Sequence, residues 1–214
     1  MNKTKIVLGK AWKVLRWVLL VAVILFILSI FIGLYGLYQQ HQYALQLADK
    51  LETDRITMVD VMGGRLPPEP DQTENDATLQ GVDSNHNGVR DDVELAIFKL
   101  HADSARIRAA ELQYAKYLQY TLDPYVWTHE VKVIIDGEFM DSAVLCRIEV
   151  ADSFGGETKD QIWREDRWTK EIDAAVLNTR ARQDQYARFN SFAQGGDTSP
   201  SGHGCDIDWK ILPN

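Results

Sequence analysis

The sequence is organised around the twelve residues Asp83-Ser84-Asn85-His86-Asn87-Gly88-Val89-Arg90-Asp91-Asp92-Val93-Glu94. Side chains that carry oxygen stand at positions 1, 3, 5, 9 and 12 of this stretch, and a glycine stands at position 6. A hard cation such as Ca2+ takes about six to eight oxygen ligands, and a glycine lets the chain turn sharply around it. The spacing therefore predicts a calcium-binding loop that opens a helix.

Each position of the loop has an expected role. The side chains expected to face the ion are those of Asp83, Asn85 and Asn87. The backbone carbonyl of Val89 would supply a further oxygen, and Asp91 would bind directly or through a water molecule. Glu94, in the first turn of the following helix, would complete the shell with both carboxylate oxygens. The alternative is an Asn-, Asp- and Gly-rich turn that only starts a helix.

Two features separate this loop from those of paired EF-hands. Position 8, which is usually aliphatic in such pairs, is Arg90, and no helix can run across the proline-rich stretch 67–70 toward the loop. The loop instead resembles the solitary Asp-x-Asp-x-Asp-Gly-Val-x-Asp loops of thrombospondin type 3 repeats and related bacterial surface proteins. With asparagine at positions 3 and 5, only three carboxylates would meet the ion. That favours weak binding, with a Kd on the order of 0.1–1 mM.

The amino-terminal segment predicts a membrane anchor. Val14 to Tyr38 is almost entirely apolar and long enough to cross a bilayer as a helix. A cleavable signal peptide has a shorter apolar region followed by a small-x-small site, and residues 33–38 are a poor cleavage site. Because the basic flank precedes the apolar run, the amino terminus is expected in the cytoplasm. We therefore expect a cytoplasmic tail (1–13), an uncleaved signal anchor (14–38) and a remainder outside the cytoplasm.

The charge balance limits the partners of that remainder. Five of the 23 Lys and Arg residues and none of the 31 Asp and Glu residues lie in the first 38 residues, which leaves 18 basic and 31 acidic residues, a net charge of −13, for the rest. Such an acidic body repels nucleic acid and anionic lipid headgroups, so neither is an expected partner. It also makes a bound cation more plausible.

Helical periodicity dominates the rest of the chain. Residues 39–62 continue as a helix by pattern, either as a stalk against a partner helix or, as we favour, packed on the body. Residues 63–82 are expected to be a linker in which nothing can pack. The domain 83–214 would then be helical, with one long helix from Val93 to Thr121.

The later segments of the domain 83–214 are less uniform. Residues 127–150 carry an apolar stripe at steps of three and four, although Val131-Lys132-Val133-Ile134-Ile135 followed by Asp136-Gly137 would also suit a hairpin. We expect a helix there. Further helices are expected over 159–177 and, after a capped restart at Asn178-Thr179, through Ala193.

Two cysteines, Cys146 and Cys205, lie on the outer side of the expected topology. An even number of cysteines in an oxidising compartment suggests one disulfide. In the chain-entropy account, closing a loop of about 60 residues would stabilise the fold by roughly 4 kcal/mol.

A broader resemblance covers residues 81–206. The loop Gly81-Val82-Asp83-Ser84-Asn85-x-Asn87-Gly88-Val89-Arg90-Asp91-Asp92-Val93-Glu94, the later Asn178-Thr179-x-x-Arg182 and the Cys205-Asp206 pair are similar to a group of uncharacterised proteobacterial envelope proteins. With the expected topology, the resemblance implies a single-pass protein of the bacterial inner membrane with a periplasmic domain. It implies no activity.

No catalytic motif is evident: the sequence lacks Gly-x-Ser-x-Gly, His-Glu-x-x-His, a phosphate-cradling glycine loop and a dinucleotide fingerprint. We therefore expect no enzyme. The expected function is that of a structural or accessory subunit, or an assembly factor, of an envelope or pilus-type complex, with a protein partner and with homo-oligomers possible. The alternatives are a calcium-responsive sensor or ligand-binding module and, more distantly, a cryptic hydrolase.

Overall fold

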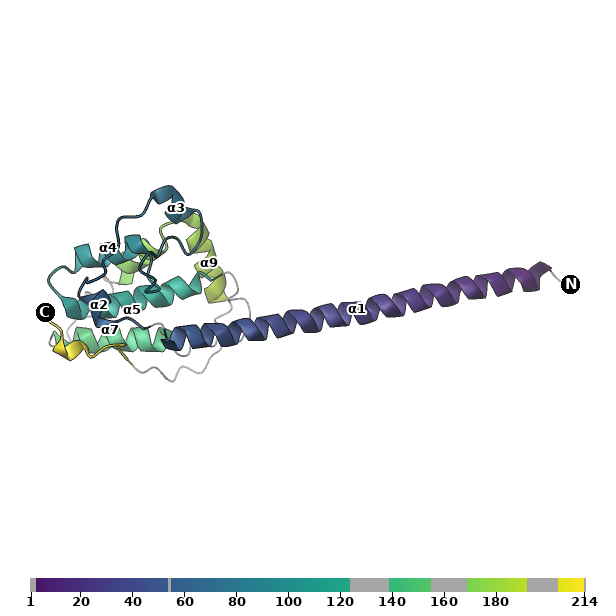
Figure 1. Cartoon of the computed structure of the whole chain (residues 1–214), viewed down its shortest axis with the longest axis horizontal. Helices are drawn as coiled ribbons and strands as arrows, with labels where there is room; N and C mark the ends of the chain where they lie inside the picture. Colours follow the sequence, from purple (N-terminus) through teal and green to yellow (C-terminus); the bar gives the residue numbers. More distant parts are fainter. Residues whose placement is uncertain (1–2, 54, 124–138, 155–168, 192–203, 214) are drawn as a thin grey trace. The chain divides into compact units, whose positions relative to one another are not determined.

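The computed structural model describes residues 3–53, 55–123, 139–154, 169–191 and 204–213. The chain divides into two compact units, Met1–Gln46 and Leu47–Asn214. Every regular element in these described ranges is a helix (Figure 1), which confirms the expected mainly helical fold.

Helix α1 spans Lys3–Thr53 without interruption (Figure 1). Within its stretch Leu15–Leu47, 18 consecutive residues reach a mean hydropathy of 3.0, and the stretch is long and apolar enough to cross a membrane. The predicted span 14–38 lies inside this helix. A candidate membrane helix near the amino terminus is therefore confirmed.

The helix expected over residues 39–62 is interrupted, so that expectation is wrong at its carboxyl end. α1 ends at Thr53, and the chain becomes helical again only at α2, Met58–Val61. The restart is a capping box: the Thr57 hydroxyl accepts from the Asp60 N–H, and the Asp60 carboxylate accepts from the Thr57 N–H at 2.9 Å. Such a box fixes a helix start. Leu47, the first residue of the second unit, is buried, which favours a packed helix end over a free stalk.

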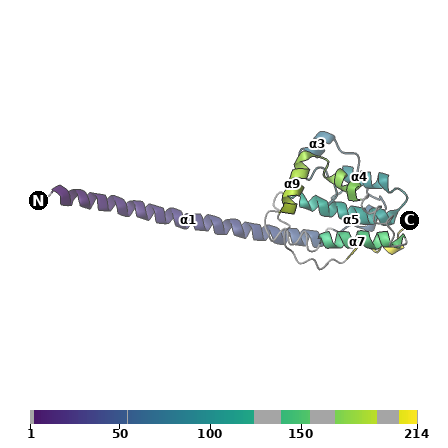
Figure 2. The same cartoon turned by 180° about the vertical axis from the view of Figure 1, so that it is seen from behind.

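Helix α5, Ala105–Thr121, is the central helix of the second unit (Figure 1 and Figure 2). The elements that contact it are α2, α4 (Asp91–Leu100), α7 (Asp141–Ser153), α9 (Arg180–Ser191) and the 3-10 helix η2 (Trp209–Ile211). Several of its buried residues are alanines, which let neighbouring helices approach closely. Its Leu112 and Leu118 are fully buried, and each such side chain contributes about 1.5–3 kcal/mol.

The single long helix predicted over 93–121 is wrong, because it is divided into α4 and α5. Ser104 is the N-cap of α5, and its hydroxyl accepts from the Ile107 N–H at 3.3 Å. The first N–H of α5, that of Ala105, donates to the carbonyl of Pro213 at 3.1 Å. A serine N-cap competes with helix continuation, and the apolar periodicity concealed it.

The later helices agree with the prediction where the structure describes them. α7 confirms a helix over 141–150, and the choice between helix and hairpin at 127–138 lies outside the described residues. Residues 169–176 are helical, as expected, and 159–168 also lie outside the described residues. α9 confirms the restart after Asn178-Thr179: the Thr179 hydroxyl accepts from the Arg182 N–H at 3.3 Å.

The segment 63–82 is packed, so the expectation that nothing in it could pack is wrong. It contains the short helix α3, Gln72–Asp76, whose first turn is capped by Asp71. Asn75 is buried, and its side-chain oxygen accepts from the Val82 N–H at 3.0 Å. This segment is therefore held by polar contacts to buried side chains rather than by an apolar face of its own.

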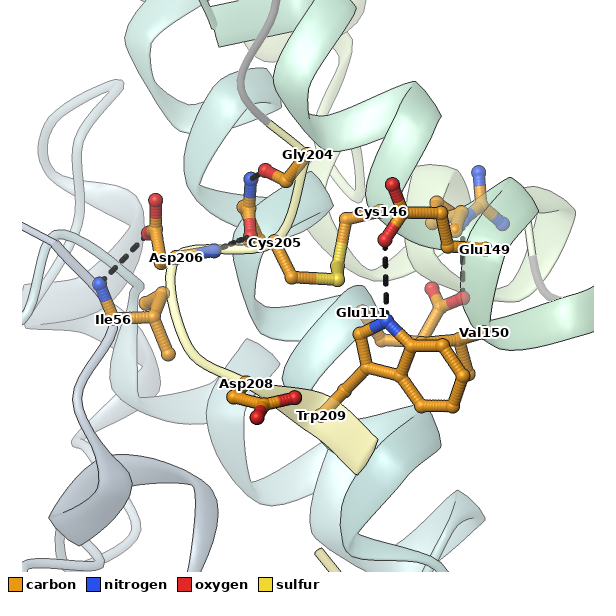
Figure 3. The surroundings of a disulfide bond; sticks show 12 residues. Ile56, Glu111, Cys146, Glu149, Val150, Gly204, Cys205, Asp206, Asp208 and Trp209 are labelled. Atoms are coloured by element: carbon orange, nitrogen blue, oxygen red, sulfur yellow. Dashed lines mark hydrogen bonds and ion pairs between the residues drawn. A yellow bond between two sulfur atoms is a disulfide. The ribbon is translucent and has the colours of Figure 1, made fainter. Parts of the chain in front are cut away.

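The last described residues, 204–213, form what we call the C-terminal clasp. The sulfur atoms of Cys146 and Cys205 lie 1.98 Å apart, the distance of a disulfide bond, which confirms the predicted pair (Figure 3). Beside the bond, Trp209 packs against a small apolar cluster that includes Val150. The clasp also reaches the chain after α1, because the Asp206 carboxylate accepts from the Ile56 N–H at 2.9 Å (Figure 3).

Candidate metal site

The predicted calcium loop is an ordered turn that leads into α4. The Asp91 N–H at the start of α4 donates to the carbonyl of Val82 at 2.8 Å and closes the loop. Gly88 has a φ of +84°, a left-handed conformation that glycine adopts without steric cost. This is position 6, where the motif requires a glycine.

Asp83, at position 1, organises the turn. Its two oxygens accept from the N–H groups of Asn87 at 3.2 Å and Gly88 at 3.0 Å. Burial raises the pKa of Asp83, the two N–H groups oppose that shift, and the charge of Asp91 adds to it. The first residue of the loop therefore holds the backbone of positions 5 and 6 around it.

Positions 3, 5 and 12 of the loop converge. The side-chain nitrogens of Asn85 and Asn87 both donate to one oxygen of Glu94, Oε2, each at 3.0 Å. The Glu94 side chain is fully buried, and its other oxygen, Oε1, has no hydrogen-bond partner. A buried carboxylate oxygen without a partner is costly, and a cation or a proton would offset that cost.

The surroundings of Glu94 also disfavour the charged form of its carboxylate. Burial raises the pKa of Glu94 to about 7, and the two amide hydrogen bonds oppose this shift. The nearby carboxylates of Asp60 and Asp91 raise it further. A bound cation would neutralise this local excess of negative charge.

The remaining predicted ligands lie in the same turn and help to hold it through hydrogen bonds that involve backbone N–H groups. Asp91 is buried, and its Oδ1 accepts from the Ser84 N–H at 2.9 Å. The Val89 N–H donates to the side-chain oxygen of Asn87 at 2.8 Å. Among the described residues, no group of three or more His, Cys, Asp or Glu side chains is placed to hold a metal ion. The observed convergence is one carboxylate with two amides.

The chemistry of this group fits a hard cation. The side-chain oxygen of Asn85 already faces the turn, where it accepts from the Asn87 N–H at 3.3 Å. Rotating the Asn87 amide by half a turn would present its oxygen where it now presents nitrogen. Together with the unpartnered oxygen of Glu94, the two amides would supply neutral and anionic oxygens of the kind that Ca2+ prefers. The neighbouring Asp83 and Asp91 carry the further carboxylates within the same turn.

Arg90, at position 8, anchors the end of the loop to another helix. Its side chain is fully buried and donates to the carbonyls of Val176 at 3.1 Å and Ala175 at 2.7 Å, at the carboxyl end of the helical residues 169–176. It also pairs with Asp92, which therefore turns away from the loop interior. The sequence showed the unusual residue type at position 8 but not this function.

Arg182 fixes the segment that leads into the loop. Its fully buried guanidinium donates to the carbonyls of Asn75 at 2.6 Å, Thr78 at 3.2 Å and Leu79 at 3.0 Å. It also pairs with the carboxylate of Asp76 at 3.0 Å. The sequence resemblance included Arg182 but gave it no role, because an arginine on a polar helix such as α9 is usually exposed.

A second buried polar group lies between α5 and α7. Glu111 pairs with Arg147 at 3.1 Å, and the Arg147 guanidinium lies 4.2 Å from the centre of the Tyr114 ring. The Tyr114 hydroxyl donates to Asp173 at 2.9 Å. Pairing of this kind makes buried charges tolerable in a helical core.

Comparison with known proteins adds no family to these observations. No protein-family model matches the chain, and neither a curated protein nor a solved structure shows a significant match.

Proposed function

We propose that this chain is a membrane-anchored, extracytoplasmic protein whose loop 83–94 binds calcium and fixes the start of a helical body. The observation that carries the proposal is the convergence of Asn85 and Asn87 on the buried Glu94, which keeps one oxygen unpartnered. The ion would be held by Asp83, Asn85, Asn87, the Val89 carbonyl, Asp91 and Glu94, with weak affinity because three of these groups are carboxylates.

Two further observations support the setting. α1 contains a stretch that can cross a membrane, and the residues before it are basic, which favours a cytoplasmic amino terminus. The disulfide between Cys146 and Cys205 suits an oxidising compartment such as the periplasm. The resemblance to envelope proteins suggests a bacterial inner membrane.

Within that setting, a structural role is the best supported. The loop is held by Arg90 and Arg182 and leads into α4, so a bound ion would orient the start of that helix. We propose an accessory subunit or assembly factor of an envelope complex, pilus systems included. Such a protein should remain bound to its protein partners in mild detergent.

Calorimetric titration of the full chain in detergent with calcium tests the proposal. Wild type should bind one ion, and Asp83→Ala should abolish the binding heat. Glu94→Gln should weaken binding more than Asp92→Ala, because Asp92 pairs with Arg90 and not with the loop interior. Equal heats from wild type and Asp83→Ala would refute calcium binding by this loop.

A further inference from the structure

Buried side chains and hydrogen bonds attach the chain between α1 and α3 to the body. The carbonyl of Val61 accepts from the Arg108 guanidinium at 3.0 Å. Gly63, with a φ of +73°, lies so close to Phe98 that an added Cβ would come within 2.9 Å of the ring. Beyond this point, the carbonyl of Arg65 accepts from the side-chain nitrogen of Asn85 at 3.0 Å.

The Asn85 amide is therefore shared between two parts of the molecule. The same nitrogen donates to the Arg65 carbonyl and to Oε2 of Glu94, in each case at 3.0 Å. Asp60, in α2, lies near enough to Glu94 to affect its charge state, and it pairs with the Arg65 guanidinium at 3.3 Å. The segment 60–65 thus contacts the candidate calcium site at a predicted ligand.

We propose that the calcium loop is a latch for the segment 60–66 and that Asn85 is its positioning residue, with its oxygen on the ion and its nitrogen on the Arg65 carbonyl. The inference rests on the proposed function, because it requires that the loop bind calcium. The bound ion would then also hold the chain between α1 and the body against the loop.

The chemistry of an amide explains the latch. When the oxygen of Asn85 faces the ion, its nitrogen points away from the ion, and Glu94 turns its oxygens to the ion as well. The amide then loses Glu94 as an acceptor, and the Arg65 carbonyl remains as a partner. The ion also fixes the plane of the Asn85 amide. With calcium bound, the Asn85 nitrogen therefore donates to the Arg65 carbonyl alone instead of to both Arg65 and Glu94.

Two substitutions separate calcium binding from the latch. Asn85→Asp and Asn87→Asp each retain an oxygen ligand and add a carboxylate, so both should bind calcium at least as tightly as wild type. Only Asn85→Asp removes the donor to the Arg65 carbonyl, because the Asn87 nitrogen donates to Glu94. Asn87→Asp is therefore the matched control.

Hydrogen exchange of the full chain in detergent, with and without saturating calcium, is the test, with calorimetry on the same samples. In wild type and Asn87→Asp, calcium should slow backbone amide exchange over residues 62–66 by about three- to tenfold, because opening this segment must also break the strengthened hydrogen bond to the Arg65 carbonyl. In Asn85→Asp, calcium should bind without this slowing. Because both variants gain any general stabilisation by the ion, their difference reports on the latch alone.

Three results would overturn the inference. Equal slowing over residues 62–66 in both variants would show that the Asn85 nitrogen is not the contact through which calcium acts. Calcium heat in wild type without slower exchange would show that no latch exists, and this result needs no variant to fold. Absence of calcium heat in wild type would instead refute the proposed function, and the latch would fall with it.

Discussion

The loop 83–94 and the C-terminal clasp are both held to the helical body, but by different chemistry. Each is a short segment without a long helix of its own, so other elements must hold it in place. The loop is held by charged and amide groups, with Arg90 and Glu94 fully buried. The clasp is held by the bond between Cys146 and Cys205 and by Trp209 against an apolar cluster. The first attachment should respond to ions and pH, and the second to redox conditions.

The largest effect should come from breaking the clasp. Replacing Cys146 and Cys205 together by alanine should lower the free energy of unfolding by about 4 kcal/mol, because the bond closes a loop with a sequence separation of 59 residues. Urea denaturation at saturating calcium measures this loss.

Maleimide labelling provides the control for that experiment. Neither cysteine of denatured wild type should react until reductant is added. Quantitative labelling without reductant would mean that the thiols are free, and would also argue against an extracytoplasmic location.

The next effect should come from the anchor of the loop. Arg90→Met should lower the free energy of unfolding by about 2–4 kcal/mol, because the carbonyls of Ala175 and Val176 lose a buried donor. The matched control is Arg180→Met, which removes an exposed pair with Asp184 and should cost less than about 0.5 kcal/mol. Equal losses in the two variants would contradict the assignment of Arg90 as a buried anchor.

A smaller effect should appear in the pH dependence of the calcium-free protein. Burial raises the pKa of Glu94 from 4.5 to about 7, so the folded state holds a proton that the unfolded state has released between these values. Stability from this group is therefore complete below about pH 4.5 and is lost as the pH rises through 7. With chelator, unfolding should be easier at pH 8 than at pH 5, by roughly 2 kcal/mol for Glu94.

Glu94→Gln isolates this group from the other buried acids. The variant should show a shallower loss of stability between pH 5 and 8 in chelator, measured by urea denaturation. The same slope in variant and wild type would mean that Glu94 is not the titrating group.

The smallest effect should be the stabilisation by calcium. With a Kd on the order of 0.1–1 mM, about 3 mM calcium should add roughly 1–2 kcal/mol and raise the Tm, because only the folded loop binds the ion. Circular dichroism should show a change of helix content of no more than a turn or two around residues 91–96. A large gain of helix, or newly exposed apolar surface detected by dye binding, would favour a sensor.

Local patterns in the sequence predicted much of this molecule. The apolar run before Tyr38, the start of α4 after the oxygen-rich loop and the restart at Thr179 each depend on a few neighbouring residues. The disulfide followed from the cysteine count and the expected topology.

Long-range polar contacts could not be predicted in the same way. Arg182 reaches residues about a hundred positions earlier in the chain, so nothing near it in sequence marks it as buried. Asn85 was predicted as a ligand, but its contact with Arg65 depends on how the folded chain returns past the loop. The caps at Thr57 and Ser104 were local signals that apolar periodicity concealed.

The most direct measurement is an experimental structure of the full chain at saturating calcium. The account predicts an ion within the loop, with both oxygens of Glu94 and the side-chain oxygens of Asn85 and Asn87 at about 2.3–2.6 Å from it. An empty loop at saturating calcium, with the nitrogens of Asn85 and Asn87 still donating to Glu94, would contradict it.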